Sequence, residues 1–419
     1  MIIVRRILFL LAAAVLLSCA GSAQQHSVTQ AEVDSITRDA ILIDTHDDVP
    51  TQIVKGYDIA TPDESGQTDL ARMKGYLGAE FFAAYVGPQY VKDNHSARRA
   101  MEMIDAIRTD VIAAHPNDFV FAASADDIVR AHREGKIAAL IGIEGGHAIE
   151  DSLRLLRDYY ALGARYMTLT HVNTNNWADS EGDINNSAVA HHNGLTPFGK
   201  DVVREMNRLG MMVDVSHVSD KTFWDVLATS TAPVIASHSA CRAVTSLPRN
   251  LTDEMMRALA AKGGVVSINF GCQFLSERYF AASRAVEAEP SIRARYAATE
   301  KIADITARVA AQDKLDAEVA SRIPPASLAD LVAHIDHAVK VAGIDHVGIG
   351  TDFDGVSCVP AEVSSYNKFP ALTRALLEKG YSAEEIKKIY GGNLLGVMRA
   401  VEQRARELQS TPPIHAQIQ

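Results

Sequence analysis

The sequence predicts an α/β fold, a (β/α)8 barrel that carries a helical insertion after its seventh strand. Short apolar runs rich in β-branched residues recur along the chain, and segments with helical periodicity separate them. This alternation is typical of parallel strands joined by crossover helices. A doubly wound open sheet is the alternative, but no glycine-rich phosphate loop follows the first run to support it.

Eight apolar runs are predicted as the barrel strands. They are residues 41–45, 79–86, 138–143, 165–170, 211–215, 233–237, 264–269 and 346–350. Amphipathic segments between them, such as 97–113, 150–162, 198–209 and 219–229, are predicted as helices. Residues 272–325 are rich in Ala, Arg and Glu and predict added helices on the catalytic side, either as a lid or dimer contact or as a solvated excursion without a role.

The ends of the chain predict export. Residues 1–23 combine Arg5 and Arg6 with a short apolar stretch, which is typical of a signal peptide. Its end resembles the lipobox of bacterial lipoproteins, so we expect cleavage before Cys19 and a lipid on that residue; ordinary cleavage after Ala23 is the alternative. Ala20 after that cysteine favours the outer membrane, facing the periplasm, over the inner membrane, and a protein without the lipid would be periplasmic or secreted. Residues 30–410 form a single predicted domain, and 411–419 a disordered tail.

Composition narrows the partners. The chain has 419 residues, 47% of them hydrophobic, and a formal net charge of −11. No Lys/Arg cluster is dense enough to follow a phosphate backbone, so nucleic acid is not an expected partner. Beyond Cys19, the cysteines Cys241, Cys272 and Cys358 leave room for one disulfide and require none. We interpret them as small buried apolar residues.

Six of the eight predicted strands end in a residue that can bind a metal or transfer a proton. These residues are His46 with Asp48, Glu144, His171, His217, His238 and Asp352. Each signal alone is weak, because a His-x-Asp pair occurs by chance and a single histidine after a strand is commonly a hydrogen-bonded rim residue. The carboxyl ends of barrel strands converge on one face, however, so the six together predict an active site.

Imidazole and carboxylate ligands without thiolate suit zinc, manganese or iron, with zinc the expected ion in an exported hydrolase. His46 and Asp48 point to the same side of an extended chain and can hold one ion. His217 and His238 can hold a second, with Glu144 bridging ions about 3.5–4 Å apart. Asp352 is then a proton acceptor and His171 an extra donor. A water shared by two such ions has its pKa lowered toward about 7, which predicts a hydrolase.

Long motifs of this chain are similar to those of the membrane dipeptidases, also called renal dipeptidases. They are "IDTHDDVP", "QTDLARMKGYLGAEFFAAYV", "IGIEGGHAIE", "LGARYMTLTHVNTNNWADS", "LTPFGKDVVREMNRLGMMVDVSHVSD", "APVIASHSACRAV", "HVGIGTDFDG" and "GGNLLGVMRAVE". The chain therefore resembles a bacterial member of this family of zinc metallopeptidases with a (β/α)8 barrel. The resemblance implies hydrolysis of small dipeptides, including those with a C-terminal D-residue, and a homodimer.

The resemblance also implies roles for individual residues. His46 and Asp48 would hold one zinc, His217 and His238 the other, and Glu144 together with a water or hydroxide would bridge them. His171 would bind the scissile carbonyl, Arg249 the substrate carboxylate, and Asp352 would pass the water's proton to the leaving amine. Trp177 and His147 are predicted to be structural, and His191 and His192 to have no ligand role.

Two other functions stay open from the sequence. Another hydrolase on the same metal barrel would act on a lactam, a lactone or an ester and would not need Arg249. A peptide-binding lipoprotein without catalysis would be the non-enzymatic alternative. The vertebrate members are anchored at the C-terminus, whereas this chain offers Cys19 at the other end.

Overall fold

A closed barrel of eight parallel strands forms the centre of the protein. The computed structural model describes residues 27–416 except 63, 65 and 93. The barrel strands are β1 (Ile43–Asp47), β2 (Ala79–Tyr85), β4 (Ile137–Glu144), β5 (Ala164–Thr168), β6 (Met212–Asp214), β7 (Val234–Ser239), β8 (Val265–Ile268) and β9 (Val347–Ile349). Each pairs in parallel with the next, and β9 pairs with β1 to close the ring. The predicted (β/α)8 barrel is confirmed, and every predicted strand lies within two residues of an observed one.

One strand was not predicted. β3 (Phe119–Phe121) pairs in parallel with the first residues of β4, with Phe119 opposite Ile137. β4 pairs with β5 only from Ile141 onward, so β3 covers the edge that β5 leaves free. A run of three residues is too short to stand out as a strand from its sequence pattern.

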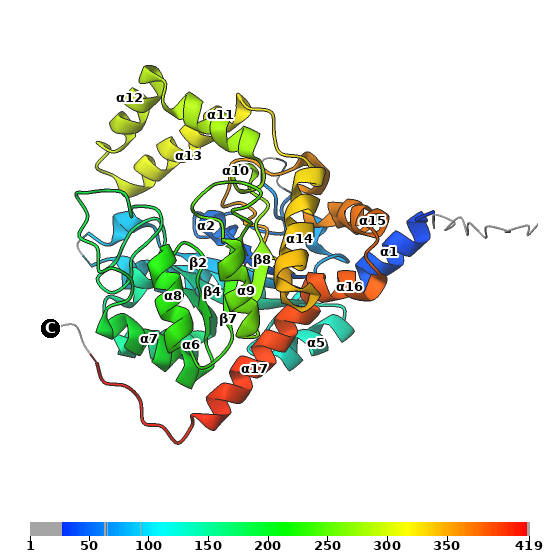
Figure 1. Ribbon diagram of the computed structural model, residues 1–419, viewed down its shortest axis with the longest axis horizontal. Coiled ribbons are helices and arrows are strands. Elements are labelled where there is room, and N and C mark those ends of the chain that lie inside the picture. Colours follow the sequence, from blue (N-terminus) through cyan, green and yellow to red (C-terminus); the bar gives the residue numbers. More distant parts are fainter. Residues whose placement is uncertain (1–26, 63, 65, 93, 417–419) are drawn as a thin grey trace, which may run out of the picture.

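Helices surround the barrel, as Figure 1 shows. They are α1 (Gln30–Asp39), α4 (Ser96–Ala106), α5 (Ala125–Arg133), α6 (Leu153–Leu162), α7 (Pro197–Leu209), α8 (Asp220–Thr229), α9 (Asp253–Ala261), α14 (Leu328–Ala342), α15 (Phe369–Lys379) and α17 (Asn393–Glu407), with the short helices α2 (Pro50–Ile53), α3 (Leu70–Met73) and α16 (Ala383–Lys387). The predicted segment 97–113 continues beyond α4 as a π-helix, Ile107–Ala113. Every helix in the described part of the chain is too short or too polar to cross a bilayer.

The strands are buried on both faces because helices cover the outside and side chains fill the inside. All eight residues of β4 are buried. Phe81, Leu140 and Tyr166 belong to one hydrophobic cluster with Leu394 and Met398 of α17. Burial of apolar surface stabilises the fold by about 25 cal/mol per Å², and this packing holds the strand ends in place.

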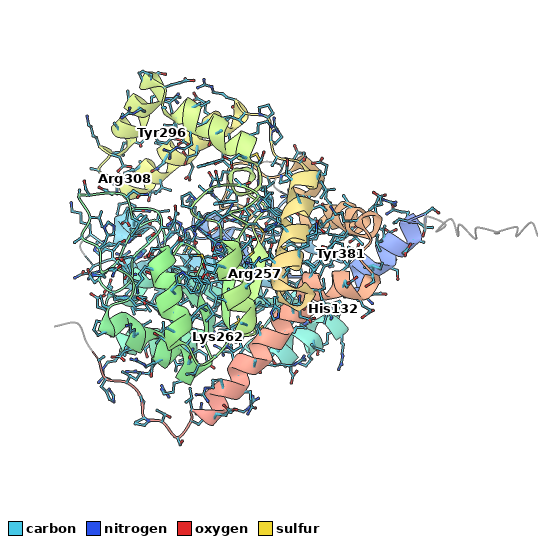
Figure 2. All side chains as sticks on the ribbon, in the orientation of Figure 1. His132, Arg257, Lys262, Tyr296, Arg308 and Tyr381 are labelled. Atoms are coloured by element: carbon cyan, nitrogen blue, oxygen red, sulfur yellow. A yellow bond between two sulfur atoms is a disulfide. The ribbon has the colours of Figure 1, made fainter. Side chains whose placement is uncertain are left out.

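The predicted insertion contains α10 (Cys272–Leu275), α11 (Glu277–Glu287), α12 (Pro290–Thr299) and α13 (Ile305–Ser321). Figure 1 shows α11 to α13 as a group at the top of the view, and Figure 2 labels Tyr296 on α12 and Arg308 on α13. The Tyr296 hydroxyl donates to Asp316 at 2.5 Å. An Arg295–Glu318 ion pair at 2.6 Å also joins α12 to α13.

A disulfide connects the insertion to the barrel. Cys272 and Cys358 are bonded, with Cα atoms 5.4 Å apart, so they form the one disulfide for which the sequence left room and are not simple apolar residues. Their separation of 86 residues hid the pairing in the sequence. Cys241 is buried, and it is the one free cysteine among the described residues, as interpreted.

The predicted signal peptide, residues 1–23 with Cys19, lies outside the described residues, so export and lipid attachment stay predictions, as does the homodimer. Of the predicted tail, residues 411–416 have neither helix nor strand. Within it, the Ile414 carbonyl accepts a hydrogen bond from Arg157, and the backbone N–H of Ile414 donates to Glu205.

We expect Cys272→Ala to lower the free energy of unfolding by about 2–4 kcal/mol, because the disulfide restricts the unfolded chain. Urea unfolding followed by circular dichroism measures the change. Dithiothreitol should lower the midpoint of the parent and of the control Cys241→Ala, and leave that of Cys272→Ala unchanged. A parent midpoint that is insensitive to the reductant would contradict the bond.

Candidate active site

All six strand-end residues or pairs predicted from the sequence lie together at the carboxyl ends of the barrel strands. His46 is within β1, Glu144 ends β4, and His238 is within β7. His171, His217 and Asp352 each lie three residues beyond the ends of β5, β6 and β9. The alternation of strands and helices in the sequence predicted that these residues meet at one face, and the barrel brings them together there.

Glu144 is at the centre of this group, with its two carboxylate oxygens facing different sets of ligands. Oε1 lies 3.0 Å from Nε2 of His217 and 3.3 Å from Nε2 of His238. Oε2 lies 3.4 Å from Nε2 of His46, and that nitrogen is 3.3 Å from Oδ2 of Asp48. The Glu144 carboxylate thus lies between two pairs of residues, with one oxygen toward His46 and Asp48 and the other toward His217 and His238.

The donor atoms fit metal ions. Nε2 of His46 is buried and makes no hydrogen bond to any described residue, although it points at two carboxylates. Burial is the main reason that the pKa values of His217 and His238 lie well below their usual range, so both rings are neutral, the form that binds a metal. Burial alone would raise the pKa of Glu144, but the neighbouring imidazoles, His46 foremost, hold it well below its usual range. Positive charge is therefore needed beside this buried anion. Bound metal ions can supply it in place of a proton on His46, because burial lowers the pKa of that ring but Tyr166, Glu144 and Asp48 together raise it well above its usual range.

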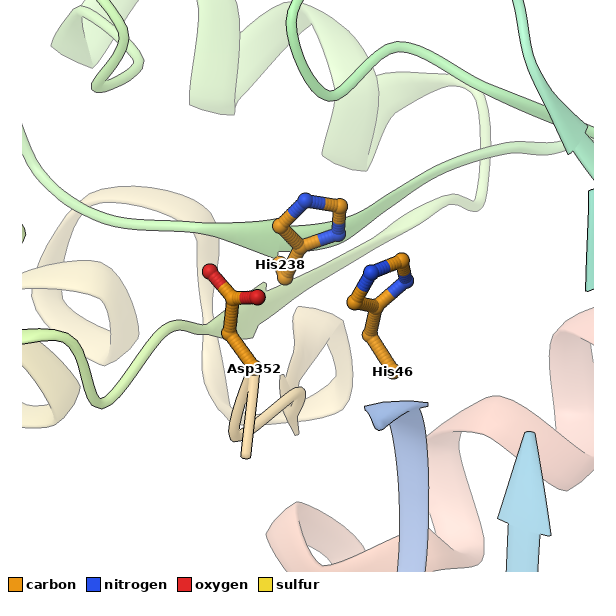
Figure 3. Close-up of side chains that lie close together, drawn as sticks. All are labelled: His46, His238 and Asp352. Carbon is orange, nitrogen blue, oxygen red and sulfur yellow. The ribbon is translucent and has the colours of Figure 1, made fainter. Parts of the chain in front are cut away.

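Asp352 lies beside one histidine of each pair, His46 and His238, as Figure 3 shows. One atom from each of these three residues falls within 4.8 Å of the others. Asn269 at the end of β8 donates to Oδ2 of Asp352 at 2.7 Å. Burial, together with the charges of Asp48 and Glu144, raises the pKa of Asp352 to about 7 against the opposing effect of His46. A carboxyl group with this pKa can both take and give a proton near neutral pH.

Two of the site residues have left-handed backbone, which is unfavourable for residues other than glycine. His217 has φ 67° and Asp352 has φ 60°. The carbonyl of His217 is held by the N–H of Glu181 at 2.9 Å and the hydroxyl of Thr170 at 3.1 Å. The N–H of Asp352 donates to the carbonyl of His46 at 3.0 Å. These bonds offset the strain and fix both side chains toward the centre.

A cleft of about 520 Å³ opens onto this centre. His171, Arg249 and Tyr85 line it together with Asp48, Glu144, His217 and Asp352. From the insertion, Val309, Asp313 and Asp316 of α13 form part of its wall. The insertion therefore bounds the cleft, and the volume is in the range of small-molecule sites.

Arg249 is buried at the rim of the cleft. Its two terminal nitrogens donate to the Ser239 hydroxyl at 2.8 Å and the His238 carbonyl at 2.9 Å. Its Nε is buried without a hydrogen bond to any described residue, and the guanidinium lies 5.7 Å from the ring centre of Phe274. A buried cation at this place can receive an anionic group of a ligand.

The residues that we predicted to be structural lie outside the ligand group. Trp177 is fully buried and packs edge-to-face on Phe198. His147 is buried in the turn after β4. Nε2 of His191 and of His192 lies near backbone carbonyls, those of Asp183 and Asn175 respectively.

Three residues of the site were missed by sequence reasoning. Tyr85 ends β2, and its hydroxyl is 3.5 Å from Nδ1 of His171. Asn269 follows β8 in the same way. Both are polar residues at the end of an apolar strand, so the signal was present, but a search for metal ligands omits Tyr and Asn. Gly355 carries no functional group and left no such signal.

Comparison with known proteins identifies the family. Residues 30–412 match the family model described as Membrane dipeptidase (Peptidase family M19). The chain belongs to the membrane dipeptidase family. It is a metal-dependent hydrolase of dipeptides, as its sequence motifs implied.

Relatives of this dipeptidase include a fungal enzyme and bacterial structures. The chain is 35% identical over 391 residues to the dipeptidase verJ of Clonostachys rogersoniana, covering 89% of this chain and 87% of that protein. The crystal structure of the probable dipeptidase PvdM from Pseudomonas aeruginosa has a TM-score of 0.76 and 27% identity, covering 90% of this chain and 99% of that chain. A metallopeptidase from Rhodobacter sphaeroides, solved with a phosphinate mimic of the dipeptide L-Ala-D-Ala, has a TM-score of 0.68 and 25% identity, covering 87% and 100%.

Gly355 of the dipeptidase provides a test of how closely the site is packed. A Cβ there would overlap Oδ2 of Asp48 and lie 2.5 Å from Oδ1 of Asp352. We expect Gly355→Ala to displace both carboxylates and lower kcat/KM for a dipeptide by about 10²-fold, with the fold retained by circular dichroism. The control is Gly396→Ala in α17, where the new Cβ would meet no described atom within 4 Å apart from its chain neighbours and the nearby backbone of its own helix. Equal activities of the two variants would contradict the packing.

Proposed function

We propose that this dipeptidase binds two zinc ions and hydrolyses the peptide bond of free dipeptides, including those with a C-terminal D-residue. The observation that carries the proposal is the position of Glu144. Its Oε1 faces His217 and His238, and its Oε2 faces His46, which is itself beside Asp48. One carboxylate between two separate ligand pairs is suited to bridge two ions.

Each part of the ligand set has a role in this proposal. His46 and Asp48 would hold one zinc, His217 and His238 the other, and Glu144 would bridge them. Bound zinc supplies an activated water and a Lewis acid for the substrate carbonyl. The ligands are nitrogen and oxygen atoms, which suits a catalytic zinc site.

Asp352 and His171 would act on the reacting atoms. Asp352 would accept the proton of the attacking water and donate it to the leaving amine, a role that its position beside His46 and His238 supports. Asn269 keeps one carboxyl oxygen oriented by its bond to Oδ2. His171 lines the cleft with Nε2 4.0 Å from Glu144, and it would donate a hydrogen bond to the developing oxyanion.

Arg249 would bind the terminal carboxylate of the substrate and so restrict it to dipeptides. The residue lines the same cleft as the ligands, and its guanidinium is held by Ser239 and by the carbonyl of His238, itself a proposed ligand. A tripeptide would place its carboxylate one residue too far from this cation when its first peptide bond is at the metals.

A C-terminal D-residue is proposed because a relative binds a mimic of such a dipeptide. The Rhodobacter sphaeroides metallopeptidase was solved with a phosphinate mimic of L-Ala-D-Ala. We further propose that the enzyme works in the bacterial cell envelope, held by a lipid on Cys19. The support for this is the lipobox-like sequence around Cys19.

The test uses the mature enzyme loaded with zinc and measures amino-acid release from L,L- and L,D-dipeptides. A tripeptide and an N-acetylated dipeptide are the substrate controls, and Asp352→Asn is the blank. We expect hydrolysis of free dipeptides of both series and none by the variant. Inactivity on all dipeptides in a protein that holds two zinc ions would contradict the proposal, and activity on lactams or esters would then favour the other hydrolase.

Arg249→Ala should lower kcat/KM for a dipeptide at least about 30-fold, because the substrate carboxylate loses its cation. This factor corresponds to a loss of about 2–5 kcal/mol of transition-state stabilisation. A dipeptide amide, which lacks that carboxylate, should be a poor substrate of the parent and should be affected far less by the substitution. The matched control is Arg204→Ala, whose guanidinium pairs with Asp201 on α7 and does not line the cleft. A variant as active on dipeptides as the parent would refute the carboxylate contact.

A further inference from the structure

The two ring nitrogens of His46 face different groups, and the one that points away from the proposed metal site has a hydrogen-bond partner. Nδ1 of His46 lies 2.7 Å from the hydroxyl oxygen of Tyr166, and both residues are fully buried. Nε2, on the opposite edge, faces Asp48 at 3.3 Å and Glu144 at 3.4 Å and has no hydrogen-bond partner in the described chain. A neutral imidazole carries one proton, so if Nε2 binds an ion, the proton is on Nδ1 and is donated to Tyr166.

We propose that Tyr166 is a positioning residue of the metal centre, whose phenol oxygen accepts the Nδ1–H of His46 and holds Nε2 toward the ion. The inference rests on the proposed role of His46 as a zinc ligand. Metal-binding histidines donate their second ring N–H to an acceptor that fixes tautomer and ring orientation, and loss of that acceptor weakens metal binding. Here the acceptor is a phenol from another strand.

A glycine on the neighbouring strand makes the contact possible. Tyr166 of β5 pairs directly with Gly142 of β4. A Cβ at Gly142 would overlap Cζ of Tyr166, so the ring passes over the position that any other side chain would fill. Phe81 of β2 packs on the same ring with centroids 5.3 Å apart. The phenol is therefore confined on two sides and points at β1.

His238, from the other ligand pair, is oriented by a different hydroxyl group. Nδ1 of His238 lies 2.8 Å from the Ser237 hydroxyl, which donates to Asp214 at 2.6 Å. His238 is thus oriented through a hydroxyl bound to a carboxylate on a neighbouring strand. The rings of His46 and His238 stack with centroids 3.8 Å apart at 24°, so a rotation of His46 would also disturb its neighbour. Each of these two proposed ligands has its own orienting hydroxyl.

The test is the zinc affinity of Tyr166→Phe, which keeps the ring and removes only the hydroxyl. Zinc is titrated into the mature, metal-free enzyme in competition with a chromophoric chelator. The melting temperature of the metal-free protein is measured in parallel. We expect the affinity of the weaker or of both ions to fall about 10- to 100-fold. Activity lost at limiting zinc should be partly restored by excess zinc.

The control is Tyr390→Phe, an equally buried tyrosine whose hydroxyl lies 2.8 Å from that of Thr373. It should leave the zinc affinity unchanged even if it lowers the melting temperature. Gly142→Ala should weaken zinc binding with the Tyr166 hydroxyl still present, and if this variant does not fold, Tyr166→Phe decides.

The outcomes separate this inference from the proposed function. A parent that binds zinc tightly, with Tyr166→Phe binding it equally well, would overturn the positioning role and leave the metal site intact. A parent whose zinc binding is unchanged by Asp48→Asn would overturn the assigned metal site, and the role of Tyr166 with it. A loss of affinity in Tyr166→Phe that Tyr390→Phe matches would reduce Tyr166 to a structural residue and also overturn the inference.

Discussion

The site depends on one buried carboxylate, Glu144, which lies among the imidazoles of His46, His171, His217 and His238. An anion in this position is costly unless positive charge is supplied nearby. Burial keeps His217 and His238 neutral. Burial also lowers the pKa of His46, but Tyr166, Glu144 and Asp48 together raise it well above its usual range, so that ring is protonated when no ion is bound. Metal ions held by the same nitrogens would supply positive charge in place of that proton, and the chemistry of the family then follows from the electrostatics of Glu144.

The rest of the fold keeps that carboxylate and its neighbours in place. Barrel closure by the β9–β1 pairing brings the first and last strand ends together, which puts Asp352 next to His46. Beneath them, the Tyr366 hydroxyl contacts the carboxylates of Asp44, Asp47 and Glu80 at 2.6–3.0 Å. Asp44 also accepts bonds from the N–H groups of His46 and Thr351. This network ties the two chain segments that flank the centre, so the ligands lie on a rigid base.

Most of the strands and of the strand-end site residues could be predicted, because a barrel brings the carboxyl ends of successive strands to one face. Apolar runs separated by helical segments predicted the strands, and the polar residue after each run predicted what meets at the carboxyl end. His46, Glu144 and Asp352 were found in this way. Arg249 was different, because it lies in a loop ten residues beyond Ser239 and only the resemblance to a family assigned it a role.

Other features had no local signal. The Cys272–Cys358 bond joins residues 86 positions apart, and nothing in the spacing indicates the pair. The contact of Tyr166 with His46 depends on the parallel register between β4 and β5 and on the absence of a side chain at Gly142. Such contacts are set by the packing of strands, which periodicity does not describe.

A calorimetric titration of the metal-free enzyme with zinc counts the bound ions and so tests whether Glu144 bridges two of them. We expect two ions per chain in the parent, and at most one ion bound with comparable affinity in Glu144→Gln. The control Glu205→Gln changes a buried carboxylate that pairs with Arg157 and Arg208, and it should still bind two. Two tightly bound ions in Glu144→Gln, or a single ion in the parent, would show that Glu144 does not bridge a pair of ions.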